Sequence, residues 1–556
     1  MSEPETARVV GDGLPAWHLA VLYVAFAALA LAVYGPSLRG DFLSDDIGYL
    51  VTNPWVHELT ASNLRVLLDP FGEAARYTAN YAPVHLVGVA LVWQAFGADT
   101  VGHHVVNVLA HALASVLLVP LFVRAGLSRR VALFGALFFL LHPANVEVGA
   151  WIFQLKTILC LALGTGAVLL HPRRPAAAAV LFVLALLAKA SAVFALPAAA
   201  FFAWRRSRLA DPVPARWGWL ALWVLAFALY ASPQIFAFEQ LGEAPRALGA
   251  DAFESLRTVF AIFARYAVMA ATSYGTAAFQ SPPPARSLLD PWWLAGLTLA
   301  LVVTLRLAWT AFRRREEAGF WLWVAAAYAP VCQIFPFLYP MADRYLYVVL
   351  PGLVGAVCLA AKTGLASRAG ALAGGRRAAL DRVGFALACV LLAAFAVRSH
   401  ERAAVFRSST TLMLDSARRY PAGLSANLLQ AQRAGQSGDA AAVAEALRRA
   451  SDLGFDSFFA VETEPSMQGV RNDPRVRAAV AEMAARWIEV ARRRGYSTPR
   501  ELQIWARAHA VRGEWKEAAA LLERALAQGG PLQAEVQRAL AEARRHLTAA
   551  GGAPPR

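Results

Sequence analysis

Two adjacent carboxylates, Asp45 and Asp46, follow the first long apolar segment of the sequence, within the run 41–47. Carboxylates near a bilayer are energetically costly, and they mark functional sites when they occur there. A carboxylate can take a proton from an attacking hydroxyl group or bind a divalent ion. Two like charges on neighbouring residues also raise the pKa of at least one of them, which suits a general base. The alternative is an ordinary solvated loop.

The composition of the chain predicts a polytopic helical membrane protein. Apolar residues make up 58% of the 556-residue chain, its mean hydropathy is +0.45, and near-spanning apolar stretches recur from Trp17 to Val397. The first stretch, 17–34, has no cleavage motif and follows a mixed-charge tail, so we interpret it as a retained span rather than a signal peptide. The N-terminus is therefore expected in the cytoplasm.

The net charge of +15 indicates membrane topology rather than nucleic-acid binding. The basic residues gather in short loops beside the ends of apolar segments, and no RNA- or DNA-binding pattern accompanies them. A disulfide framework is not expected, because the four cysteines have neither paired nor metal-ligand spacing. They all lie in apolar segments and are interpreted as small core residues: Cys160, Cys332, Cys358 and Cys389.

Basic loops tend to stay in the cytoplasm, and they set the predicted topology. Five such loops occur, at 124–130, 173–174, 205–216, 313–315 and 362–382. About eleven spans put every one of them inside and leave the C-terminus outside: 17–34, 103–123, 131–142, 151–170, 177–188, 190–203, 217–233, 290–311, 319–336, 344–361 and 383–397. Three of these spans are short for a crossing, and the segments 83–97 and 257–272 fit better as helices in the outer leaflet.

The same topology places the unusual polar residues on or near one face. Five sequence-distant sites contribute to it, whereas randomly placed surface charges would divide between the two sides. We therefore expect one extracytoplasmic site between helices. Its candidate residues are, in chain order, Asp45, Asp46, His142, Glu147, Lys156, Lys189, Asp343, Arg344 and Tyr345.

The composition changes after Val397, where long apolar runs end and Arg, Glu, Ala and Gln become frequent. We predict two domains, a membrane domain at 1–397, with an outer loop at 35–102, and a soluble extracytoplasmic helical domain at 398–556. Two segments of the second domain carry the packing positions of tetratricopeptide repeats. The alternative is a generic Ala-rich helical bundle. The repeat positions follow two glycines: Gly438 precedes Val443, Leu447 and Ala450, and Gly513 precedes Trp515, Ala518, Leu522 and Ala525.

The order of these motifs resembles the GT-C membrane glycosyltransferases with C-terminal tetratricopeptide repeats, which include the animal O-mannosyltransferases of this architecture and their bacterial relatives. The resemblance covers essentially the whole chain and rests on several motifs in order, none of them specific alone. They are Asp45-Asp46 with Asn53-Pro54, His104 and Asn107 with His111, His142-Pro143 with Glu147, Ala188-Lys189, and Asp343-Arg344-Tyr345 with Tyr347.

This resemblance implies an all-α fold and a glycosyltransferase. The donor would be a sugar, with mannose as a candidate, on a polyprenyl phosphate, and the acceptor a hydroxyl group of an extracytoplasmic protein or glycan. The location implied is a bacterial inner membrane, with the site and the repeats in the periplasm and the repeats binding the acceptor. No cofactor is assigned, and a divalent cation, Mg²⁺ or Mn²⁺, is left open with Asp45 or Asp46 as its ligand. The chain lacks a Gly-rich nucleotide fingerprint.

The chemistry of glycosyl transfer assigns roles to these residues. Asp45 or Asp46 would be the catalytic base, and Glu147 a second acid that contacts sugar or acceptor. The donor phosphate needs cations, for which Lys156, Lys189 and Arg344 are the candidates. Some alternatives stay open: Lys189 could snorkel from an ordinary span, and Lys156 could form a salt bridge with Glu147. The supporting residues are His142, which could bind Glu147 or cap a helix, Asp343, Tyr345 and Asn53.

Three histidines and several departures from the family pattern also bear on this hypothesis. The histidines at 103, 104 and 111 are expected to make buried polar bonds between helices rather than to bind metal. The chain departs from the family pattern at Tyr81-Ala82-Pro83, where Arg76 or His85 could substitute, and also at Lys156 and Ala190, which leaves a changed donor or lost activity open.

The competing function is a non-catalytic scaffold that recruits envelope partners through its repeats. A transporter is third, since no inverted halves are visible.

Overall fold

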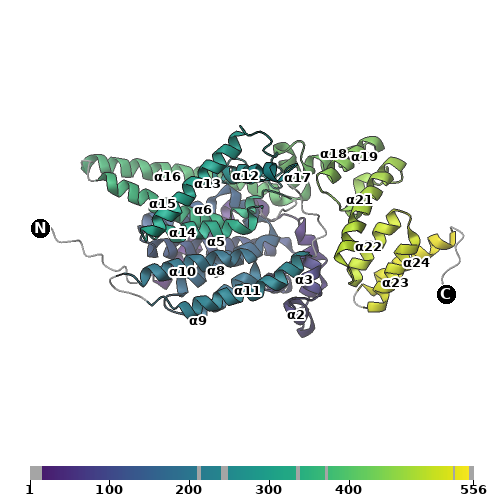
Figure 1. Ribbon diagram of the computed structural model, residues 1–556, viewed down its shortest axis with the longest axis horizontal. Coiled ribbons are helices and arrows are strands. Elements are labelled where there is room, and N and C mark those ends of the chain that lie inside the picture. Colours follow the sequence, from purple (N-terminus) through teal and green to yellow (C-terminus); the bar gives the residue numbers. More distant parts are fainter. Residues whose placement is uncertain are drawn as a thin grey trace.

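The computed structural model describes residues 15–209, 214–239, 248–333, 339–369, 374–529 and 532–549. In these ranges the chain is helical, and its only β-type pairing is an isolated bridge between Gln280 and Met341 (Figure 1). The all-α prediction is confirmed.

Six helical segments in the described part of the chain are long and apolar enough to cross a membrane, and a bent pair of helices makes a seventh if it counts as one span. The polytopic prediction is therefore confirmed, whereas the count of eleven stays a prediction. The six segments are built on α1 (Ala16–Tyr34), α5 (Thr100–Arg124), α8 (Leu155–Leu170), α11 (Trp217–Glu239), α13 (Pro291–Phe312) and α16 (Gly374–Ala403).

Further helices fill the remaining part of the membrane domain. Three of them are apolar but too short for a standard crossing, namely α4 (Pro83–Phe96), α9 (Pro175–Ala188) and the apolar part of α15 (Val349–Ala369). The others are α6 (Arg129–Leu141), α7 (Val146–Ala150), α10 (Ala195–Arg206), α12 (Ala252–Thr272) and α14 (Glu317–Tyr328).

The break between α6 and α7 places functional residues at the end of a span. Residues before proline avoid the α conformation, and His142, which precedes Pro143, is extended with φ −68° and ψ 126°. Its Nδ1 atom accepts the Ala144 N–H, so His142 caps the turn η4 (Pro143–Asn145). The helix pair bends by 49° at this point. After α7, a second turn, η5 (Ile152–Gln154), leads into α8.

The outer loop that carries Asp45 and Asp46 folds into short helices with a small core of its own. These are η2 (Ile47–Val51), η3 (Pro54–Val56), α2 (Ala61–Leu68) and α3 (Glu73–Thr78). The buried residues Leu50, Trp55 and Leu67 pack with Leu86 of α4 and Ile152 of η5. This core ties the loop to the start of α8.

The basic loops meet one another at one end of the helices. Arg124 donates to the Leu169 carbonyl at the end of α8, and its charge interacts with those of Arg173 and Arg206. Arg205 pairs with Glu316, with 2.6 Å between N and O. In addition, Lys362 donates to the Gly126 carbonyl over 2.7 Å. We call these contacts the basic end of the bundle.

The C-terminal helices form an arm beside the bundle (Figure 1). Helix α16 runs past the predicted boundary at 397 to Ala403, and Leu412 of α17 (Ser409–Arg419) still belongs to the membrane core. Two separate hydrophobic clusters follow. They are built from α18 (Leu424–Gln436), α19 (Ala440–Asp452), α20 (Phe458–Thr463), α21 (Pro474–Arg494), α22 (Pro499–Val511), α23 (Trp515–Gln528) and α24 (Gln533–Ala549).

The two predicted repeat segments are helix–turn–helix units. Helices α18 and α19 pack together, as do α22 and α23, and the turns contain Gly438 and Gly513 with φ +76° and +77°. Only glycine adopts that left-handed conformation without strain. The packing positions behave as predicted, since Val443, Leu447 and Ala450 are fully buried. The units have the helical hairpin form on which the repeat hypothesis depends.

Candidate active site

Asp46 is a buried anchor of the outer loop. Its side chain is 1% exposed, and both of its carboxylate oxygens accept backbone hydrogen bonds at 2.7 Å. One bond comes from the Leu43 N–H within the loop, and the other comes from the Phe153 N–H in η5. Burial raises the pKa of Asp46, while these two hydrogen bonds oppose the rise. Asp46 thus fixes the loop against the start of α8.

Asp45 has the opposite environment, although it is the next residue in the chain. It is exposed and forms no hydrogen bond or ion pair with the residues that the structure describes. The surrounding protein atoms still desolvate the carboxyl group and raise its pKa, and the charges of Lys156 and Arg344 partly offset that rise. Of the two predicted bases, Asp45 is the one with free oxygens.

Glu147 holds Arg344 in a buried ion pair. The Arg344 backbone N–H donates to Glu147 Oε2 over 2.7 Å, and its guanidinium group donates to Oε1. Glu147 is fully buried, and the side chain of Arg344 is 14% exposed. The guanidinium carbon lies 5.0 Å from the ring centre of Tyr345 and 5.5 Å from that of Trp151. Glu147 therefore engages Arg344 through both of its oxygens.

Lys156 does not form the ion pair with Glu147 that its position in the sequence favoured. The reason is geometric, because the backbone and side chain of Arg344 occupy both Glu147 oxygens. The ammonium nitrogen of Lys156 lies 3.6 Å from the ring centre of Phe153 and 5.2 Å from that of Tyr49. Lys156 is only 8% exposed, and no acidic group described in the structure forms an ion pair with it. Two aromatic faces partly stabilise this charge.

Lys189 lies where α9 ends, in an extended backbone conformation before η6 (Ala190–Phe194). Its ammonium group donates to Thr157 Oγ1 over 2.8 Å, and Thr157 donates in turn to the side chain of Gln154 over 2.7 Å. Its charge interacts with those of Arg344 and Lys156. We call this group the Asp45 cluster, consisting of Asp45, Asp46, Glu147, Lys156, Lys189 and Arg344.

Three of the four supporting candidates, Asp343, His142 and Asn53, hold the backbone rather than join the open part of the cluster. Asp343 is fully buried and accepts from Ala277 N, from the amide of Gln280 and from Arg402. His142 contacts the Ala270 carbonyl at 3.1 Å and caps η4, so it does not bind Glu147. Asn53 caps η3 through the Trp55 N–H. Only Tyr345 adjoins the cluster, beside Arg344.

The histidines follow the polar-bond prediction where contacts are recorded. His111 lies 2.8 Å from the Tyr347 hydroxyl and 3.1 Å from the Leu140 carbonyl, and His103 contacts the Gly97 carbonyl. Over the described ranges, no group of three or more His, Cys, Asp or Glu side chains is arranged to hold a metal ion. Asp46 has both oxygens engaged, and Asp45 stands beside two cations. This donor set does not fit a divalent cation.

Aromatic and polar residues that were not predicted from the sequence surround the cations. Tyr49 packs against Phe153 with 4.5 Å between ring centres, and its hydroxyl donates to the Thr78 carbonyl over 2.6 Å. His85 is fully buried near both rings, without a hydrogen-bond partner in the described structure. One signal was available: Phe153 stands three residues before Lys156, a spacing that brings side chains together on a helix.

The described residues thus define an all-helical polytopic membrane protein with a cluster of carboxylates and cations at the start of α8. No protein-family model and no curated protein sequence matches the chain. Among solved structures, it is similar to the crystal structure of ArnT from Cupriavidus metallidurans bound to undecaprenyl phosphate. The two chains are 16% identical, the match covers 96% of this chain and 88% of that one, and the TM-score is 0.29. A likeness at that TM-score carries no argument about the roles of individual residues.

Proposed function

We propose that this protein is a glycosyltransferase of the GT-C class, which moves a sugar from a polyprenyl-phosphate carrier to a hydroxyl group of an extracytoplasmic protein or glycan. The observation that carries the proposal is the pairing of a free carboxylate, Asp45, with a buried ammonium group, Lys156, that forms no ion pair with the acidic groups described here. A buried charge without an ionic partner is costly unless a ligand supplies the partner. A lipid phosphate is such a ligand. Mannose is the candidate sugar.

The reaction follows from the positions of these groups. The acceptor oxygen forms a bond to the anomeric carbon while the bond from that carbon to the phosphate oxygen breaks, and the electron pair of the broken bond leaves with the phosphate. Asp45 takes the acceptor proton, because its oxygens are free and its raised pKa makes it a stronger base than an ordinary aspartate. Lys156 stabilises the charge that grows on the leaving phosphate, and Arg344, held by Glu147, adds a second positive group.

The sidedness of this reaction is part of the proposal. Helix α8 has Lys156 near its first residue and contacts Arg124 of the basic end near its last. At about 1.5 Å per residue, a helix of this length separates the two groups by most of a bilayer core. If the basic end faces the cytoplasm, the Asp45 cluster faces the periplasm. The C-terminal helices would then lie on that side and take part in acceptor binding as tetratricopeptide-like repeats.

Donor consumption by the purified full-length protein tests the proposal. The protein would be incubated with radiolabelled polyprenyl-phosphate sugars, mannose among them, with and without a membrane extract as the source of acceptor. We expect one donor to be consumed by the natural protein, and its consumption to be lost in Asp45→Asn. If no donor is bound or consumed while the protein still captures an envelope partner, the scaffold function replaces this one.

A further inference from the structure

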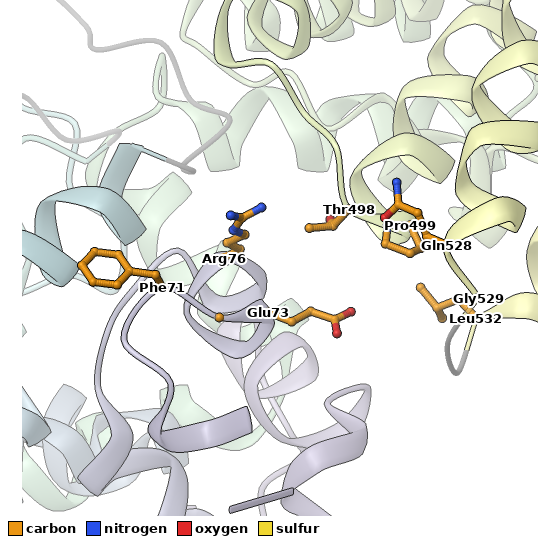
Figure 2. A pocket seen from close by; sticks show the side chains of 9 residues that line it. Phe71, Glu73, Arg76, Thr498, Pro499, Gln528, Gly529 and Leu532 are labelled. Carbon is orange, nitrogen blue, oxygen red and sulfur yellow. The ribbon is translucent and has the colours of Figure 1, made fainter. Parts of the chain in front are cut away.

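A cavity of about 400 Å³ lies between the outer loop and the C-terminal helices, outside the Asp45 cluster (Figure 2). One wall comes from the loop segment 71–76, and the other comes from the start of α22 and from residues 528, 529 and 532. In Figure 2 the side chain of Glu73 extends from the first wall toward the second. The lining residues are Phe71, Gly72, Glu73, Arg76, Thr498, Pro499, Gln528, Gly529 and Leu532.

The first wall belongs to the outer loop that carries Asp45 and Asp46. Helix α3 supplies Glu73 and Arg76 to the cavity, and its last residue, Thr78, accepts the hydrogen bond from Tyr49. The ring of Tyr49 faces Lys156 at 5.2 Å. The preceding residue of α3, Tyr77, donates from its hydroxyl group to the Thr52 carbonyl over 3.0 Å. Helix α3, which lines the cavity, is therefore connected to the Asp45 cluster by two contacts, from Thr78 to Tyr49 and from Tyr49 to Lys156.

The second wall is preorganised by its own hydrogen bonds. Thr498 caps α22 in a reciprocal capping box with Glu501, and Gln528 donates to the Ser497 carbonyl over 2.7 Å. Beside the cavity, the guanidinium carbon of Arg500 lies 3.9 Å from the ring centre of Tyr77. This contact joins the two walls directly and sets the width between them.

The lining identifies the chemistry of the occupant. The single acid and the single base of the lining, Glu73 and Arg76, cancel in charge, so the cavity does not select a lipid phosphate or another anion. Phe71, Pro499 and Leu532 offer apolar surface, whereas Thr498 and Gln528 offer neutral polar groups. Both walls belong to segments outside the candidate membrane spans. The occupant is therefore neutral and approaches from water.

Arg76 supplies an independent sign of a ligand. Its Nε atom is buried and has no hydrogen-bond partner in the described structure, although the guanidinium group stacks on Phe236 at 5.1 Å. Buried donors are rarely left unpaired, and a carbonyl oxygen would satisfy this one. A volume of about 400 Å³ is far too small for a folded domain but suits a short extended segment.

We propose that this cavity binds an uncharged, extended segment of a polypeptide acceptor and thereby brings a Ser or Thr hydroxyl group to Asp45. The inference rests on the proposed function for the reaction that follows, but not for the binding itself. Backbone carbonyls of the segment would accept from Arg76, and its backbone N–H groups would donate to Glu73 or to the side-chain oxygen of Gln528. A hydroxyl-bearing protein is thus favoured over a glycan or a lipid-linked acceptor.

Photo-crosslinking tests the binding without relying on transfer. The probes are uncharged heptapeptides containing Ser or Thr and a benzophenone group, applied to the full-length protein, with the crosslinked residues located by mass spectrometry. We expect crosslinks in 71–76 and 498–532. Leu532→Trp fills the cavity and Arg76→Leu removes the unpaired donor, so each should reduce crosslinking about tenfold or more. Two matched controls should not change it: Ala534→Trp on the exposed face of α24 and Arg65→Leu on the exposed face of α2.

The outcomes separate this inference from the proposed function. Crosslinks at these walls that Leu532→Trp and Arg76→Leu abolish support the binding site, even if no polyprenyl-phosphate sugar is consumed. Crosslinks elsewhere, or crosslinks that respond equally to the controls, overturn it. Binding of the polyprenyl-phosphate donor, measured beside the crosslinking without acceptor, should be unchanged in all four variants. If transfer goes to a glycan and no peptide is crosslinked, the polypeptide assignment is wrong while the glycosyltransferase stands.

Discussion

Cations lie at both ends of helix α8, but the two groups differ in whether the protein supplies hydrogen-bond or ion-pair partners for them. At the basic end, each cation with a recorded contact has a partner: Arg124 and Lys362 donate to carbonyls, and Arg205 pairs with Glu316 and with the Arg314 carbonyl. In the Asp45 cluster, by contrast, the ammonium group of Lys156 lies against two aromatic faces and has no recorded hydrogen bond or ion pair. Positive charge that serves topology can be satisfied locally, whereas positive charge that serves a ligand must be left available.

The same contrast separates neighbouring carboxylates. Asp46 uses both oxygens to hold the loop, and Glu147 uses both to hold Arg344. Asp45 keeps its oxygens free, beside the cations. Two fully engaged acids thus position one free acid and its positive partners, which is the preorganisation that electrostatic catalysis requires. The predictions below test this division, beginning with the largest expected effect.

Asp45→Asn should abolish sugar transfer while leaving the fold intact. Loss of a general base reduces the rate by about 100- to 10,000-fold. Asp45 bonds to no described residue, so the thermal unfolding temperature should not fall. Transfer rate and unfolding would be measured together, with Arg205→Gln at the basic end as the comparison. Near-normal transfer by Asp45→Asn, or equal loss in Arg205→Gln, would contradict the division.

Glu147→Gln should destabilise the protein strongly. It removes one partner of a buried ion pair and leaves the Arg344 charge uncompensated, which costs about 3–5 kcal/mol in such pairs. Glu316→Gln is the matched change at the basic end, where both partners are more exposed, and its effect should be smaller. Denaturant unfolding in detergent measures both. Equal losses would show that burial of the Glu147–Arg344 pair has no special role.

Asp46→Asn should lower stability and transfer together, in contrast to Asp45→Asn. An amide retains one acceptor oxygen for two N–H donors, so one buried backbone N–H loses its partner, at about 1–3 kcal/mol. The expected result is a lower unfolding temperature with a partial loss of transfer. If stability is unchanged and transfer is lost completely, Asp46 rather than Asp45 is the base.

The pH dependence of transfer should report the environment of Asp45. Desolvation by the surrounding protein atoms raises its pKa, and the base works only when deprotonated, so transfer should decline on acidification at a higher pH than an ordinary aspartate would cause. The charge of Lys156 opposes that rise. Lys156→Met should therefore move the acid limb of the pH profile to still higher pH, whereas Arg205→Gln should leave it in place. An acid limb that does not respond to Lys156→Met would place the titrating group elsewhere.

Much of the fold, but less of the site, could be predicted from the sequence. Apolar stretches and basic loops are local signals, so they predicted helices and the clustering of 124–130 with the other basic loops. The span count is harder, because His142-Pro143 and Lys189 interrupt apolar runs and leave short helices. The turns at Gly438 and Gly513 could be predicted because glycine is favoured at positive φ.

The candidate site was harder to predict from the sequence, because its contacts join residues that are far apart in the chain. Nothing in the run 41–47 distinguishes Asp45 from Asp46, and the difference arises from a hydrogen bond to Phe153, 107 residues away. A salt bridge between Glu147 and nearby Lys156 was one of two roles left open, yet the partner of Glu147 is Arg344, 197 residues away. Charge patterns thus indicated which residues gather, and only the three-dimensional contacts distinguish the engaged groups from the free ones.

Binding of a polyprenyl phosphate tests the central claim most directly, because it measures the availability of the cation without requiring the correct sugar. The affinity of the full-length protein for a polyprenyl phosphate would be compared among the natural protein, Lys156→Met and Arg205→Gln. A charge-assisted contact of about 1.5–3 kcal/mol predicts that Lys156→Met weakens binding by about 10- to 100-fold. Arg205→Gln should leave the affinity unchanged. Equal affinities for Lys156→Met and the natural protein would contradict the account.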